Sequence, residues 1–71
     1  MSSREMFDTL LQPMENLLLN VIHGKVKNRE ISKEIYHNVI VLGLSKFYQL
    51  QDTNKFPAWI FAITRNEIAA Y

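Results

Sequence analysis

The chain has 71 residues, 48% of them hydrophobic, which argues against disorder and for one domain near the lower size limit for independent folding. Eight basic and seven acidic side chains give a formal net charge of +1, so no strong basic signature marks it as a nucleic-acid-binding protein. The lack of cysteine excludes disulfides and thiolate chemistry, and two histidines are too few for the usual zinc site of cysteine and histidine ligands.

The first expected element covers about residues 4–22, where apolar residues recur at steps of three and four, as in an amphipathic helix. Ser2 and Glu5 fit a capping box at its start. Pro13 interrupts the pattern, because a proline inside a helix removes one hydrogen bond and costs about 3 kcal/mol. The helix either kinks at Pro13 or is split there, with residues 4–11 as a shorter first helix. The apolar stripe keeps its phase across Pro13 and favours the kink.

A polar, basic loop is expected over residues 24–30. Gly24 is expected to end the first helix in the left-handed conformation that glycine tolerates. Half of the eight basic residues fall within nine positions here, and such a cluster can contact phosphate groups, with a solvated loop as the plainer alternative. These residues are Lys25, Lys27, Arg29 and Lys33.

The second helix is expected over residues 31–49. Its segment VIVLGL, residues 39–44, is also compatible with a buried strand. The apolar stretch is longer than a usual strand, however, and a single strand would have no pairing partner. Gly43 is either a tolerated cost of about 1 kcal/mol or a point of close packing. Because three helices cannot enclose one of their own, we expect part of this apolar helix to be exposed and to meet a partner or a second copy.

Residues 49–56 are expected to form a polar loop, and a third helix to run from Pro57 to Tyr71. Phe56 precedes proline and is biased away from the helical region, whereas Pro57 suits the first turn of a helix. The helical pattern runs to the last residue, which is typical of a piece cut from a longer protein. Together the elements predict a small all-α bundle of three helices, or four if the first is split at Pro13.

The last helix also carries a family resemblance. FPAWIFAITRNEIAAY, residues 56–71, resembles the F-x-x-W-hydrophobic-x-x-I-x-R-N signature of region 2 of bacterial RNA polymerase sigma factors, especially the extracytoplasmic-function group. Upstream, LLQPMENLLL has the proline of that family's first helix. SKEIYHNVIVLGLSKF lies where the family carries an acidic residue, an aliphatic pair, a glutamine and then an apolar helix. The match covers residues 6–71 and implies a single region-2-like domain over 1–71, without the region 4 that reads the upstream promoter element.

The resemblance implies a transcription initiation module. In that family the second helix of region 2 docks on a coiled coil of the polymerase β′ subunit. Carried onto this chain, the docking residues are Glu34, His37, Asn38 and Val41. Their spacing places all four on one helix face, as docking against another helix requires. His37 stands where the family usually has glutamine, and its ring can donate a similar hydrogen bond.

The resemblance also implies contact with DNA. In the family, the loop before the third helix and that helix itself hold the unpaired strand of the promoter −10 element. The corresponding residues are Asn54, Lys55, Trp59, Arg65 and Asn66. Aromatic rings with cationic and amide groups suit single-stranded bases, which offer faces for stacking and edges for hydrogen bonds. Plainer roles are a core position for Trp59 and a surface ion pair with Glu67 for Arg65.

The alternative function is a protein-binding helical module or a regulator that mimics region 2 without binding DNA, which the small net charge favours. Other partners implied by the resemblance are an anti-sigma factor or a separate subunit that carries region 4. No cofactor or metal is expected. No serine, histidine and acid form a nucleophile setting, and two glycines leave no glycine-rich phosphate loop, so we expect no enzyme. No apolar run approaches a membrane span, and the start lacks a signal peptide, so we expect a soluble, cytoplasmic protein.

Overall fold

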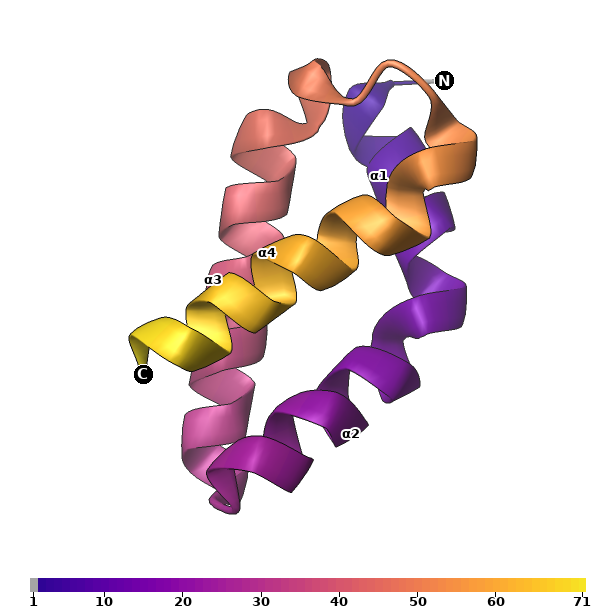
Figure 1. Cartoon of the computed structure of the whole chain (residues 1–71). Coiled ribbons are helices and arrows are strands. Elements are labelled where there is room, and N and C mark those ends of the chain that lie inside the picture. Colours follow the sequence, from indigo (N-terminus) through magenta and orange to yellow (C-terminus); the bar gives the residue numbers. More distant parts are fainter. Residues whose placement is uncertain (1) are drawn as a thin grey trace.

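The computed structural model describes residues 2–71, and within that range it contains four α-helices, three short 3₁₀ turns and no strand (Figure 1). The predicted all-α fold is therefore confirmed, and a strand over residues 39–44 is excluded. The molecule is elongated, with extents of 36 × 19 × 17 Å, and α4 runs diagonally across the other helices. The helices are α1 (Ser3–Leu11), α2 (Glu15–Val26), α3 (Arg29–Lys46) and α4 (Phe56–Ala70).

The first predicted helix is divided at Pro13. After α1 ends, Gln12–Met14 form one turn of 3₁₀ helix, and α2 begins at Glu15. The backbone keeps right-handed helical angles at Gln12 and Glu15, so no loop separates the two helices. The favoured single kinked helix is thus replaced by the split alternative. The physical reason is that proline cannot continue the α-helical hydrogen-bond pattern, whereas it suits the first turn of a new helical segment.

The predicted start of α1 is confirmed, but the predicted end of α2 is wrong. Ser2 Oγ accepts a hydrogen bond from the Glu5 amide at 3.1 Å, and the Ser2 amide donates to Glu5 Oε1 at 3.4 Å. Gly24 lies inside α2, and the left-handed residue is Lys27, with φ 61°. The left-handed residue that ends α2 is Lys27 because the next residue, Asn28, already caps α3. Asn28 accepts a hydrogen bond from the Ile31 amide at 3.1 Å. The expected basic loop over 24–30 shrinks to two residues.

A single apolar core unites the four helices. Gly43 lies at its tightest point, because a Cβ atom there would approach Cε1 and Cζ of Phe7 to 2.9 Å and Cδ1 of Ile60 to 3.0 Å. This confirms the close-packing interpretation of Gly43. The buried apolar side chains are Phe7, Leu11, Leu18, Ile22, Ile35, Val39, Phe56 and Ile60.

An aromatic cluster closes the end of the core where α3 meets α4. The Phe7 ring packs edge to face on Phe47 and Phe56, with centroid distances of 5.5 and 5.6 Å. Phe56 is helical, with φ −53° and ψ −47°, although it precedes Pro57, so the predicted bias away from the helix is overridden. Burial of the ring and edge-to-face pairs, about 0.5–1.5 kcal/mol each, offset the local steric cost. Pro57 lies in the first turn of α4, as predicted.

The connection between α3 and α4 is more ordered than the predicted polar loop. One 3₁₀ turn, Phe47–Gln49, extends α3, and a second, Thr53–Lys55, leads directly into α4. The side chain of Asp52 accepts a hydrogen bond from the Asn54 amide at 3.0 Å and so fixes the second turn. The segment that precedes α4 therefore has a regular, capped turn.

Candidate functional site

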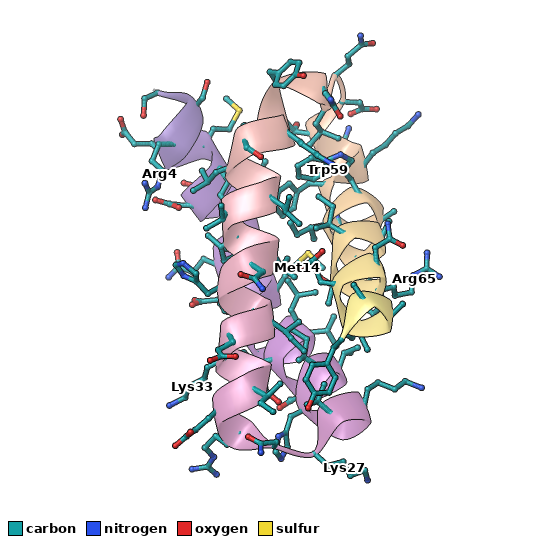
Figure 2. All side chains as sticks on the ribbon, turned by 90° about the vertical axis from the view of Figure 1, so that its left-hand side faces the viewer. Arg4, Met14, Lys27, Lys33, Trp59 and Arg65 are labelled. Carbon is teal, nitrogen blue, oxygen red and sulfur yellow. The ribbon has the colours of Figure 1, made fainter. Side chains whose placement is uncertain are left out.

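One exposed face of α3 carries all four residues that were predicted to bind polymerase. We call Glu34, His37, Asn38 and Val41 the docking face; each of them is exposed. At about 100° per residue, they fall within a sector about 100° wide. The buried residues of the same helix point the other way, toward α2 and α4: Ser32, Ile35, Val39 and Gly43. Figure 2 views the molecule from the side of α3.

Val41 is the apolar part of the docking face. It is 51% exposed, whereas Val39, two residues earlier, is 0% exposed. The imidazole of His37 and the amide of Asn38 come one turn before it on the same helix face, and the carboxylate of Glu34 comes two turns before it. Such a mixed surface fits another helix, because apolar contact supplies area while the polar groups fix the register.

Three of the five residues predicted to bind DNA lie together at the start of α4. Asn54 and Lys55 are exposed in the 3₁₀ turn before the helix, and Trp59 follows one turn later. The Trp59 ring is half-buried, with centroids 5.8 Å from Phe56 and 6.2 Å from Phe47. Trp59 is thus partly buried and packs against the edge of the core. The residue is only partly buried and lies at this end of the bundle (Figure 2).

The other two predicted DNA-binding residues lie further along α4 and do not share one face. Asn66 is seven residues after Trp59, on nearly the same side and about 10 Å along the helix axis. Arg65 is turned by about 100° from Asn66 and points away from the body of the molecule (Figure 2). Its expected ion pair with Glu67 is not formed in residues 2–71. A strand lying over Trp59 and Asn66 would therefore reach Arg65 only at its flank.

Sequence reasoning missed an exposed aromatic residue near the same end. Tyr48, in the turn after α3, is 80% exposed, and its hydroxyl accepts a hydrogen bond from Gln49 Nε2 at 3.2 Å. Its ring is free to stack on a base or on a partner's side chain. The sequence signal that could have indicated this exposed ring is a tyrosine next to the polar segment before α4. The change from α to 3₁₀ geometry at Phe47 made its exposure hard to foresee.

A second tyrosine, Tyr36, has the opposite environment. Its hydroxyl is buried, and within the described part of the chain it has no hydrogen-bond partner. Burial, and to a lesser extent the carboxylate of Glu15, raise the pKa of Tyr36 to about 12. The phenol therefore stays protonated at neutral pH and fills space between the helices rather than transferring protons.

Comparison with known protein families, curated proteins and solved structures finds no match for this chain. Across residues 2–71, no three side chains of histidine, cysteine, aspartate or glutamate gather in a way that would hold a metal ion. None of the helices described is both long enough and apolar enough to cross a membrane. The relation to sigma region 2 therefore depends on the sequence resemblance and stays a prediction.

Proposed function

We propose that this protein is a cytoplasmic transcription initiation module similar to sigma factor region 2. Its docking face binds the coiled coil of the polymerase β′ subunit. The segment from Asn54 to Asn66 binds the non-template strand of the −10 element. The observation that carries this proposal is the docking face: Val41 is half exposed and follows three exposed polar side chains, on the side of α3 away from the core.

The support for helix docking is physical as well as sequence-based. The opposite side of α3 already packs on α2 and α4, so a partner helix can approach along the docking face without disturbing the core. Side chains spaced by three and four residues form the ridges that interlock with another helix. Glu34, His37 and Asn38 supply hydrogen-bonding groups along that ridge, and these set the register of the complex.

The DNA-binding half is supported by chemistry at the start of α4. An accessible aromatic edge, an amide and an ammonium group suit an unstacked base and its phosphate. With a net charge of +1, the chain alone attracts DNA weakly. We therefore expect DNA to be held by the complex with polymerase rather than by the free protein.

The test of polymerase docking is a pull-down with core polymerase. We expect His37→Ala/Asn38→Ala to bind about tenfold or more weakly, because two polar contacts at a helix interface are lost. Asn16→Ala, at an exposed position of α2, is the matched control and should bind like the unmodified protein. Equal retention of all three proteins would overturn the proposed docking face.

A protein-binding module without DNA binding is the second candidate. The separation of Arg65 from the side of Trp59 and Asn66, together with the small net charge, favours it. A labelled single-stranded −10-like oligonucleotide, added to the complex with polymerase at low and moderate salt, separates the two. Binding that weakens in Lys55→Ala/Asn66→Ala supports the module that contacts DNA. A complex that forms but never retains the oligonucleotide supports the second candidate.

A further inference from the structure

The corner between α2 and α3 contains a hollow that the proposed function does not use. It lies at the end of the bundle opposite Trp59, in the region marked by Lys27 and Lys33 in Figure 2. Its volume is about 330 Å³. The lining comes from the last turns of α2 and the first turns of α3: Leu19, Asn20, His23, Arg29, Ser32 and Lys33.

The charged groups of this hollow are cationic. Arg29 and Lys33 are one helical turn apart and therefore extend from the same side of α3. Neither forms an ion pair in the part of the chain that the structure describes, and no carboxylate lines the hollow. Glu30 and Glu34 are each the next residue along α3, turned by about 100° from the neighbouring cation. Two exposed cationic side chains that form no ion pair thus line one hollow.

A partly buried hydrogen-bond chain contacts the exposed histidine in the wall of the hollow. Ser32 is 4% exposed, and its hydroxyl donates to the Asn28 carbonyl oxygen at 2.7 Å. Because that hydroxyl has a single proton, its contact with His23 Nδ1 at 3.3 Å requires the imidazole to donate. The other ring nitrogen, Nε2, is left without a partner among the described residues. Ser32, held by this hydrogen bond, forms a fixed part of the lining of the hollow.

The start of α3 adds to the positive field. The 18-residue helix begins at Arg29, so its positive end lies beside the hollow. Lys25 and Lys27 are exposed at the same corner. Two members of the basic cluster that the sequence shows, Arg29 and Lys33, thus line the hollow, and the other two are exposed near it on the chain.

We propose that this hollow binds a phosphate group. Arg29 offers a planar fork of N–H donors that matches phosphate oxygens, and Lys33 adds a second charge one turn away. The Asn20 amide supplies a neutral donor in the opposite wall. The phosphate belongs either to a nucleic-acid backbone or to a phosphorylated small molecule. This site is separate from the docking face and from the DNA-binding residues of α4.

The proposal is tested by titrating inorganic phosphate at constant ionic strength and following backbone amide resonances by NMR. We expect saturable shifts at residues 29–33 and at His23. Arg29→Gln/Lys33→Gln should weaken phosphate binding about tenfold or more, since two charge-assisted contacts are lost. Arg4→Gln/Lys46→Gln removes the same charge from exposed positions outside the hollow and should change the affinity less than about twofold.

Duplex DNA added in a second titration identifies the source of the phosphate. Shifts at the same amides assign the site to a nucleic-acid backbone, and a response to inorganic phosphate alone assigns it to a small molecule. Circular dichroism verifies that each variant is folded, and Lys33→Gln alone gives the same comparison if the double variant loses helix. No saturable shift with either ligand, or equal weakening in both double variants, would overturn the proposal.

Discussion

Val39 and Val41 are identical side chains two residues apart on α3, yet one is 0% and the other 51% exposed. The first belongs to the buried ridge that faces α2 and α4, and the second to the docking face. The difference shows what a small bundle can do with a helix that is apolar on most sides. Neighbouring helices cover one side, part of the apolar surface on the other side stays exposed, and we propose that a partner binds there.

The largest effect should come from placing a charge on each side of α3. Val39→Asp puts a carboxylate into the core without a partner. The free-energy cost of burying this charge exceeds the stability of a domain of this size, so we expect the Val39→Asp protein to be unfolded. Val41→Asp is solvated and should change the free energy of unfolding by about 0.5 kcal/mol or less. Circular dichroism and urea denaturation compare the two. A folded Val39→Asp protein would contradict the assignment of the two faces.

Two glycines allow the same comparison between a buried and an exposed position. A methyl group at Gly43 would press on the Phe7 ring, which Phe47 and Phe56 hold in place. Overpacking of about 1–3 kcal/mol should outweigh the helix-propensity gain of about 1 kcal/mol, so Gly43→Ala should be less stable. Gly24, in α2, has no atom within 4 Å of such a methyl group. Gly24→Ala should therefore be more stable, and urea midpoints that shift in the same direction for both would refute this account.

The smallest effect concerns Tyr36, which lies on the buried side of α3, close to the direction of Gly43. Tyr36→Phe removes a buried hydroxyl without a partner and should be up to about 1 kcal/mol more stable at neutral pH. Burial raises the pKa of Tyr36 in the folded protein to about 12, whereas an ordinary tyrosine has a pKa of 10.0. The contribution of the protonated phenol to the free energy of unfolding is fully present below pH 10 and is lost as the pH rises toward 12.

The pH dependence of unfolding checks the Tyr36 prediction. Over pH 10–12 the unmodified protein should lose stability relative to Tyr36→Phe. Tyr48→Phe, at an exposed position, is the control and should keep the decline of the unmodified protein. If Tyr36→Phe declined as steeply as the control, the buried environment of Tyr36 would be wrongly described.

The helical fold could be predicted from the sequence because apolar spacing and capping residues are local signals. The capping box at Ser2 and Glu5 and the close packing at Gly43 are confirmed. The end of α2 could not be predicted, because the position of the reversal depends on where Asn28 starts the next helix. Phe56 was predicted outside the helix because the rule for residues before proline ignores the aromatic cluster that buries its ring.

The candidate site was predictable in part, because helical spacing is also a local signal. The family resemblance selected the four residues of the docking face, helical periodicity predicts that they share one side, and the structure places them on one exposed side. The hollow at the corner of α2 and α3 was not predictable, since it requires His23 and Lys33 from different helices to meet. The exposure of Tyr48 also depends on a local change of helix type that the sequence does not reveal.

The most direct test of the central claim is the affinity of Val41→Asp for core RNA polymerase. This substitution leaves the fold intact on our account and places a charge at the apolar, C-terminal end of the docking face. We expect binding to weaken about tenfold or more, because the apolar contact is replaced by a carboxylate that must be desolvated. A folded Val41→Asp protein that binds polymerase as tightly as the unmodified chain would contradict the claim that this face of α3 is the docking surface.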